Sequence, residues 1–356
     1  MKQANYLDLL VSLIEIPSFS KEEDRTAECI ATYLKTHGVT VQRFGNNIVA
    51  YNKHYHASKK NILLNSHHDT VKPNASYTKN PFEAQCIDGR VYGLGANDAG
   101  GALVCLIEVF LFFYTNESLP FNVILAATAE EEISGPGGIE SILLQLPPID
   151  FALVGEPTAM KMAIAERGLL VVDCITYGIA AHVAHYKNDN ALYTALEDIA
   201  WLRAYTFEKT SALLGNTTAL VTKINAGDLH NMVPDTCTFV IDVRVNDCYT
   251  LAEILSILQN NMKATLIPRS TRLQPSALSS MHPILQIAKQ LGIETIGSKT
   301  ISDMALIPCN AVKIGPGDSL RSHTADEFIG INELEEGIAI YKEILLNFKT
   351  YYETLG

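Results

Sequence analysis

The chain has 356 residues, of which 47% are hydrophobic and 19% charged, enough apolar material for two packed domains. Its net charge of −12 is unfavourable for binding nucleic acid or an anionic membrane surface and favours a cationic group or a metal ion as ligand. Its 7 cysteines include no CxxC pair and indicate reduced thiols, so we expect a cytoplasmic protein.

Neither the N-terminus nor the most apolar stretch has the pattern of a targeting or membrane segment. The first sixteen residues carry Asp8 and Glu15, where a signal peptide needs an uninterrupted apolar core. The most hydrophobic stretch, residues 101–114, is interrupted by Glu108 and is too short to span a bilayer. We therefore expect no membrane partner.

The order of predicted elements alternates helices with short strands. Apolar residues at helical spacing predict helices near 3–16, 22–37, 99–114, 189–204, 250–262, 283–291 and 333–350. Short runs rich in β-branched residues predict strands at 61–66, 122–128, 151–156, 169–176, 218–226, 237–245 and 311–317. Asp88-Gly89, between two further extended runs, predicts a type I′ hairpin.

Two different patterns of predicted strands and helices along the chain indicate two domains. In residues 1–165 and 279–356, apolar strands alternate with helices, as in a mostly parallel sheet covered by helices on both faces. In residues 166–278 the strands alternate apolar and polar positions, as in an antiparallel sheet that carries two helices. The fold class is therefore α/β, with an α+β domain inserted into the first domain.

Side chains of metal-ligand type follow several predicted strands at their carboxyl ends, where open α/β sheets bind ligands. They are His67, Asp69, Asp98, Glu130, Glu131, Glu132, Glu156 and His323. Each has an ordinary alternative: Asp98 could cap a helix, and the acidic triplet could begin one. Together, however, several carboxylates at one edge would repel one another unless a cation neutralised them. Two histidines with carboxylates suit zinc or a similar divalent ion.

Five motifs, in order along the chain, resemble those of the dizinc family of acetylornithine deacetylase, succinyl-diaminopimelate desuccinylase and glutamate carboxypeptidase. They are "SHHDTV" at 66–71, "GLGANDAGG" at 93–101, "TAEEEISG" at 128–135, "LVGEPT" at 153–158 and "SHTADEFI" at 322–329. The resemblance implies a catalytic domain like that of zinc exopeptidases (1–165 plus 279–356). It also implies that the inserted domain (166–278) is a lid that mediates dimerisation, and that the protein is a hydrolase of linear amides.

The resemblance also implies two metal ions per subunit. His67, Asp98 and Glu156 would bind one zinc ion, and Asp98, Glu132 and His323 the other, so that Asp98 bridges them. Cobalt or manganese would be substitutes for zinc.

Further roles follow from the same motifs. Glu131 would be the general base, and Asp69 would orient the imidazole of His67, since residues two apart on an extended chain face one way. The chain departs from the family at Glu130, where the family has Asp, and at Gly100, where it commonly has Lys.

Three residues of the inserted domain match the family's substrate-contacting segments. His182, in "GIAAHVAH", would reach across a homodimer to stabilise the tetrahedral intermediate in the partner's site, with His185 as the alternative. Asn231 and Arg244 would lie near the substrate carboxylate. Arg244 has a structural ion pair on a strand as its alternative.

The substrate implied is a small-molecule N-acyl amino acid, first N-acetyl-L-ornithine in arginine biosynthesis. N-succinylornithine, succinyl-diaminopimelate and dipeptides stay open, since Lys299, Lys313 or Arg321 could meet a second carboxylate. From another class, a catalytically dead binding relative would have lost a ligand position. A dinucleotide-binding oxidoreductase needs a third glycine where "GLGANDAGG" has Asn97-Asp98.

Overall fold

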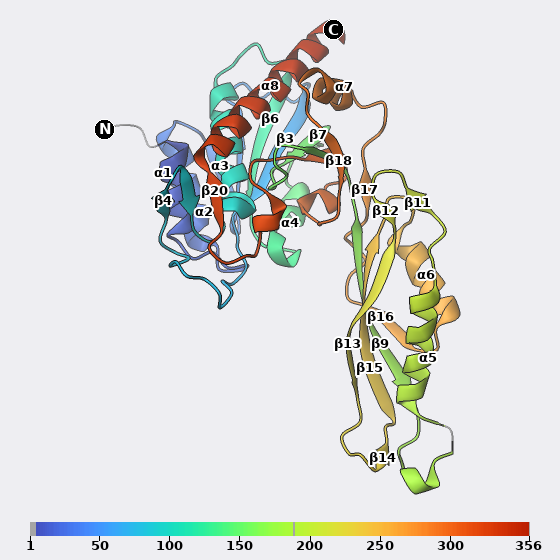
Figure 1. The fold of residues 1–356 in the computed structure, drawn as a ribbon. Helices are drawn as coiled ribbons and strands as arrows, with labels where there is room; N and C mark the ends of the chain where they lie inside the picture. The colour runs from blue at the N-terminus through green and yellow to red at the C-terminus, as the bar shows by residue number, and fades with distance from the viewer. Residues whose placement is uncertain (1–4, 188, 356) are drawn as a thin grey trace. The chain divides into compact units, whose positions relative to one another are not determined.

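The computed structural model describes residues 5–187 and 189–355 of the chain. They form two compact units, which Figure 1 colours along the chain. The first unit comprises Met1–Ile164, Leu278–Ile296 and Ser302–Gly356; the second comprises Ala165–Ala277 and Gly297–Ile301. The short segment Gly297–Ile301 thus belongs to the second unit, although the sequence assigned it to the first domain.

A mixed sheet has the strand order β1-β2-β6-β3-β7-β19-β8-β17, with β18 beside β8. Its central pairs, β6–β3, β3–β7 and β7–β19, are parallel, whereas β1–β2, β2–β6, β19–β8 and β8–β17 are antiparallel. The predicted parallel character therefore holds for the centre of the sheet and not for its edges. The strands are β1 Val41–Phe44, β2 Asn47–Tyr51, β3 Lys60–His67, β6 Phe121–Thr128, β7 Phe151–Val154, β8 Met162–Glu166, β17 Ser276–Ala277, β18 Thr295–Ser298 and β19 Asn310–Lys313.

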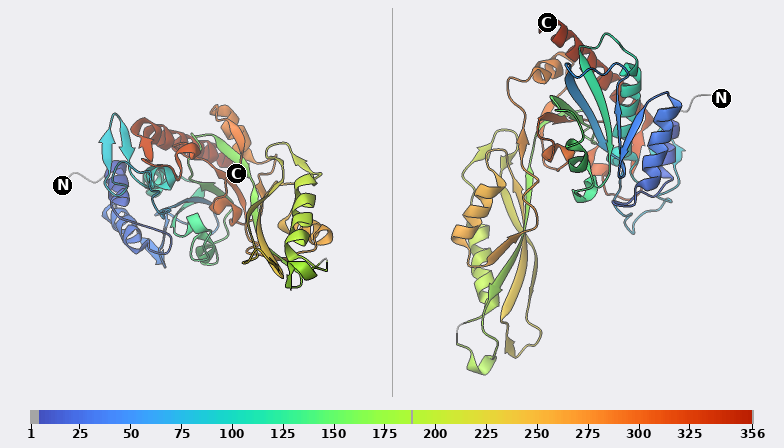
Figure 2. Two further views of the ribbon diagram at one scale, coloured as in Figure 1. Left: turned by 60° about the horizontal axis from the view of Figure 1, so that its bottom comes forward. Right: turned by 180° about the vertical axis from the view of Figure 1, so that it is seen from behind.

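Helices cover both faces of this sheet, as Figure 2 shows from two further sides. One face packs against α1, α2, α3, α7 and α8, and the other against α4. The predicted helix near 3–16 begins in residues 3 and 4, which lie outside the described residues. The helices are α1 Tyr6–Ile14, α2 Asp24–Thr36, α3 Gly101–Tyr114, α4 Ile139–Leu143, α7 Pro283–Gln290 and α8 Ile331–Leu355.

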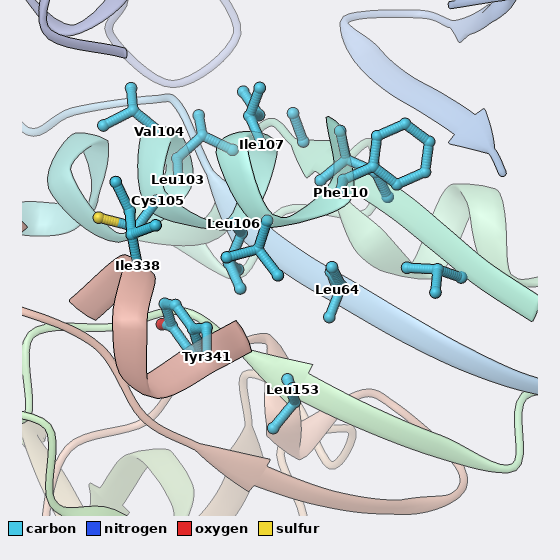
Figure 3. Close-up of a cluster of buried hydrophobic side chains, with 14 of the residues drawn as sticks. Leu64, Leu103, Val104, Cys105, Leu106, Ile107, Phe110, Leu153, Ile338 and Tyr341 are labelled. Carbon is cyan, nitrogen blue, oxygen red and sulfur yellow. The ribbon is translucent and has the colours of Figure 1, made fainter. Parts of the chain in front are cut away.

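Helix α3 lies at the centre of the core, and its buried side chains include Leu103, Leu106 and Phe110. Figure 3 shows them in one cluster with Leu64 of β3 and Tyr341 of α8. The segment Ala96–Tyr114 is long and apolar enough to cross a membrane, but 78% of its most apolar stretch is buried within the protein. Such burial is what a core helix requires, because a helix that is apolar all round needs protein on every side.

The second unit has a four-stranded antiparallel sheet in the order β13-β15-β9-β16. Alternate residues of β9 and β15 are buried against α5 and α6. Two short ladders, β10–β14 and β11–β12, complete the unit. The elements are β9 Gly168–Tyr177, β10 Ala181–His182, α5 Ala191–Ala204, β11 Thr210–Ser211, β12 Gly215–Asn216, β13 Thr218–Ala226, β14 Met232–Val233, β15 Thr236–Val245, α6 Leu251–Asn261 and β16 Thr265–Pro268.

A small three-stranded sheet brings two distant segments of the first unit together. The predicted type I′ hairpin is confirmed: β4 (Gln85–Ile87) and β5 (Arg90–Tyr92) flank Asp88 and Gly89, both with positive φ. Strand β20 (Phe328–Gly330) pairs with β5. This pairing holds the segment after His323 next to the segment that leads to Asp98.

Candidate metal centre

The parallel strands at the centre of the sheet all end at one edge, and most of the predicted ligands lie there. His67 is the last residue of β3, Glu131 and Glu132 follow β6, and Glu156 follows β7. Parallel strands present their carboxyl ends on the same side, so residues distant in sequence converge without any special loop.

His67 is the centre of the first group of donors. Its Nε2 atom lies 3.3 Å from Asp98 Oδ1, 3.7 Å from Glu156 Oε1 and 3.8 Å from Glu131 Oε2. The imidazole is buried, and its Nδ1 is 3.0 Å from the backbone carbonyl oxygen of Asp69. A donor bond from Nδ1–H to that carbonyl leaves the Nε2 lone pair facing the three carboxylates, as a metal ligand requires.

His323 completes a second group of donors. Its Nε2 atom is 2.9 Å from Glu132 Oε2 and 3.7 Å from Asp98 Oδ2. Asp98 therefore faces His67 with one carboxylate oxygen and His323 with the other. That is the arrangement of a carboxylate shared between two cations.

The donor set fits a pair of divalent ions. Within each of two sets of donors the ligand atoms all lie within 4.8 Å of one another; the sets are His67/Glu131/Glu156 and His67/Asp98/Glu132. Burial, together with the charges of Asp98 and Glu132, raises the pKa of Glu156 to about 8, against the opposing effect of His67. The hydrogen bond to Glu132 raises the pKa of His323 to about 9. Without a cation these groups hold protons, so metal binding should displace them.

Asp69 contacts both His67 and the backbone of the acidic loop that carries Glu131 and Glu132. Its carboxylate accepts hydrogen bonds from the Ser20 hydroxyl at 2.7 Å and from the backbone N–H groups of Glu131 at 3.1 Å and Glu132 at 3.2 Å. Oδ1 is also 3.4 Å from Nδ1 of His67. One buried carboxylate thus positions both the imidazole and the acidic loop.

The backbone conformation of Glu130 directs its side chain away from those of Glu131 and Glu132. It has a φ of 55°, and its carboxylate accepts a hydrogen bond from the N–H of Gly137 at 3.3 Å. The side chain therefore turns toward the glycine-rich turn, whereas Glu131 and Glu132 lie close to the two histidines.

Two buried carboxylates beside the centre were not found from the sequence. Asp303 accepts a hydrogen bond from Thr128 Oγ1 at 2.7 Å, and burial raises its pKa to about 6. Burial and the charge of Asp98 raise the pKa of Glu327 to about 8, against the opposing hydrogen bonds from backbone N–H groups. Glu327 lies within the quoted motif "SHTADEFI", so its position was available as a signal. Asp303 had none, because only the tertiary fold brings it under β6.

His182, Asn231 and Arg244 all belong to the second unit. His182 and Asn231 are neighbours, because the N–H of Val183 donates to the Asn231 carbonyl at 3.1 Å. Arg244 lies near the opposite end of β15 from the β10–β14 ladder, where two of its nitrogens bond the Asp242 carboxylate at 2.7 and 3.1 Å. The ion pair that the sequence left open for Arg244 is therefore present.

The three cations that could meet a second substrate carboxylate have different environments. Lys313 is buried on β19, where its charge opposes the rise in the pKa of Glu156. Arg321 forms a two-point ion pair with Glu333, at 2.7 and 3.1 Å. Lys299 belongs to the second unit. Neither Lys313 nor Arg321 is thus an uncommitted surface cation.

Residues 63–347 match the sequence profile of the family described as Peptidase family M20/M25/M40. The chain belongs to this family. It is 26% identical over 371 residues to a protein named succinyl-diaminopimelate desuccinylase from Wolbachia pipientis wMel, with 96% of this chain and 93% of the relative covered. Membership in the M20/M25/M40 family makes the protein a metal-dependent hydrolase that acts on amide bonds.

Solved structures of the family share the fold. An M20 metallo-carboxypeptidase from Sulfolobus solfataricus superposes with a TM-score of 0.77 at 18% identity, over 98% of this chain and 99% of that one. A Bacillus subtilis protein described as a dinuclear metal-binding peptidase of the M20 family superposes with a TM-score of 0.73 at 15% identity, over 97% and 98%. The mixed α/β sheet flanked by helices, with a separate antiparallel sheet, is therefore the family's architecture.

The acidic triplet provides a matched test of the metal centre. Glu132→Gln should lower the bound metal by one ion per subunit, because an amide cannot replace the carboxylate that faces His323. Glu130→Gln should leave the metal content unchanged, since Glu130 bonds Gly137 instead. Metal analysis of the two variants after dialysis gives the comparison. Equal metal content in both would contradict the placement of the second ion.

Proposed function

We propose that the protein is a dimetal amidohydrolase that releases the acyl group from an N-acyl amino acid, with N-succinyl-diaminopimelate as substrate. The observation that carries the reaction class is the pair of donor groups joined by Asp98, with Glu131 beside them. The substrate rests on the name of the Wolbachia relative, which covers almost the whole chain. The sequence favoured N-acetylornithine as substrate, but the names of the relatives give it no specific support. The expected role in arginine biosynthesis loses its support for the same reason.

Zinc is the metal that we propose, with two ions per subunit and cobalt or manganese as substitutes. His67, Asp98 and Glu156 would hold one ion, and Asp98, Glu132 and His323 the other. These nitrogen and carboxylate oxygen donors are the ligands of hydrolytic zinc sites. When bound, two such ions polarise a scissile carbonyl and lower the pKa of a water molecule.

Glu131 is proposed as the group that moves the proton. Burial raises the pKa of its carboxyl well above the ordinary value, and the charges of Glu156, Asp303 and Glu132 add to this, against the opposing charge of His67. Bound cations would lower this pKa and leave Glu131 ionised beside both donor groups, where it can take a proton from water and return it to the leaving amine. Asp69 would keep Glu131 and His67 in place for this step.

His182 is proposed as the donor to the developing oxyanion in the partner's site of a homodimer. Its Nδ1 accepts a hydrogen bond from the N–H of Ala184 at 3.2 Å, so the neutral ring carries its proton on Nε2 and can donate it. For the dimer, strand β13 is the outer strand of its sheet, and Leu220 and Ile224 on it are 67% and 43% exposed. An edge of this kind pairs readily with another strand.

Asn231, next to His182, is the residue that we propose for contact with the substrate carboxylate. Arg244 was expected to share this role, and would do so only by leaving Asp242. The reduced cysteines and the amino-acid substrate suit a cytoplasmic enzyme.

Hydrolysis of four substrates by the zinc-loaded protein tests the proposal. We expect N-succinyl-LL-diaminopimelate to have the highest kcat/KM, above N-succinylornithine, N-acetylornithine and a dipeptide. It carries a carboxylate at the far end of its side chain that N-succinylornithine lacks, in addition to the succinyl carboxylate that N-acetylornithine lacks, and a site that binds these groups rejects substrates without them. Release of free amine is measured, with the Glu131→Gln variant as the blank. A preference for N-acetylornithine would return the first expectation, and no turnover of any substrate would favour a binding relative.

Glu131→Gln should bind two metal ions and remain folded, but lose turnover by about a hundredfold or more, because no other group at the centre has its position. Metal analysis and kcat on the best substrate are measured together. Retention of more than a tenth of wild-type kcat would remove Glu131 from the role of base.

A mixed dimer tests the reach of His182. His182→Ala and Glu131→Gln homodimers should each be nearly inactive, since loss of one oxyanion donor costs about 10²–10³ in rate. In the co-expressed mixture, the heterodimer has one complete site, in which the Glu131→Gln subunit supplies His182. Random pairing should then restore roughly a quarter of wild-type activity. A mixture as inactive as its parents, or a monomer in sedimentation at micromolar concentration, would reject the arrangement.

A further inference from the structure

Glu327 is a buried residue whose carboxylate accepts hydrogen bonds from one loop, residues 95–98. It precedes β20, is 2% exposed, and accepts hydrogen bonds from three backbone N–H groups. These come from Gly95 to Oε2 at 3.2 Å, from Asn97 to Oε1 at 2.8 Å and from Asp98 to Oε1 at 2.9 Å. In addition, the N–H of Gly93 donates to the backbone carbonyl of Glu327 at 3.0 Å.

Residues Ala96–Gly100 of this loop form a single π-helical turn, and the N–H groups at its start have no partner within the turn, as at any helix N-terminus. Asp98 has φ −118° and ψ 98°, outside the helical region, and Asn97 is fully buried. A backbone N–H buried without a partner is unfavourable, so the conformation of this loop depends on an acceptor at the position of the Glu327 carboxylate.

The same segment of chain also carries His323. The Asn97 side chain bonds the backbone of Asp318 twice. Its Nδ2 donates to the Asp318 carbonyl oxygen at 3.1 Å, and its Oδ1 accepts from the Asp318 N–H at 3.0 Å. The loop with Asp98 and the segment 318–327 with His323 are therefore joined at two points. Both contacts lie within the first unit.

We infer that Glu327 is a positioning residue of the metal centre, which fixes the Asp98 carboxylate relative to His323 so that it serves both groups of donors. The inference rests on the proposed dimetal function, because the position of the Asp98 carboxylate has to be fixed on both sides only if it binds two cations. Partners behind metal ligands typically affect metal affinity by about 10–100-fold.

Glu327→Gln is the informative change, because it keeps the size of the side chain. Its amide oxygen can still accept from Asn97 and Asp98, but its NH₂ group would face the N–H of Gly95, donor against donor. Asp326→Asn is the matched control. The adjacent carboxylate accepts from the N–H groups of Thr78 and Lys79, both at 2.9 Å, in a loop without a proposed ligand.

The test is titration of the metal-free proteins with Zn²⁺ by calorimetry and with Co²⁺ by visible absorption, without substrate. We expect Glu327→Gln to bind at least one ion about 10–100-fold more weakly than wild type, and Asp326→Asn to bind within threefold. On a substrate that the wild type hydrolyses, Glu327→Gln should lower kcat with KM nearly unchanged.

Wild-type affinity for both ions in Glu327→Gln, with only a lower Tm, would overturn the inference and leave Glu327 a structural residue. Should this variant fail to fold, Glu327→Asp keeps the charge but shortens the reach, and the same titration applies to it. A wild-type protein that binds two ions but hydrolyses no acyl amino acid would reject the proposed function alone. One that binds a single ion would reject both.

Discussion

The mutual repulsion of carboxylates at one edge of the sheet is the constraint on which the rest of the centre depends. Asp98, Glu131, Glu132 and Glu156 are largely buried around His67, with the more exposed His323 at one side, and like charges are costly in such a place. Burial raises the pKa values of Glu131 and Glu156, so the centre holds protons until a cation replaces them. The stability of the fold, the affinity for metal ions and the protonation of these carboxylates are therefore coupled.

The sequence predicted the parts of this centre that local pattern encodes. Apolar runs that end at His67 or just before Glu156 mark buried parallel strands and the side chains that follow them, and the Asp88-Gly89 hairpin follows from turn chemistry. The antiparallel edges of the sheet and the position of Asp303 were not predictable in this way. They depend on which strands pair and on a side chain that arrives from the far end of the chain, 175 residues after Thr128.

The departure at Gly100 has a physical counterpart in the fold. A Cβ atom at Gly100 would lie 2.5 Å from the carbonyl oxygen of Gly95, so this backbone excludes the lysine that the family commonly carries there. A different lysine is buried near the same centre: Lys313, whose charge acts on Glu156. In this chain the cation beside Glu156 therefore comes from β19.

The division of the chain into two units separates two tasks. Every proposed metal ligand, together with Asp69 and Glu327, belongs to the first unit, whereas His182 and Asn231 belong to the second. Metal affinity should therefore be a property of the first unit, set by how accurately Asp98 is held. In the proposed mechanism, turnover in addition needs the oxyanion donor His182, which lies on the β10–β14 ladder of the second unit. A change in the second unit that lowers kcat without altering metal affinity would be the natural result of this division.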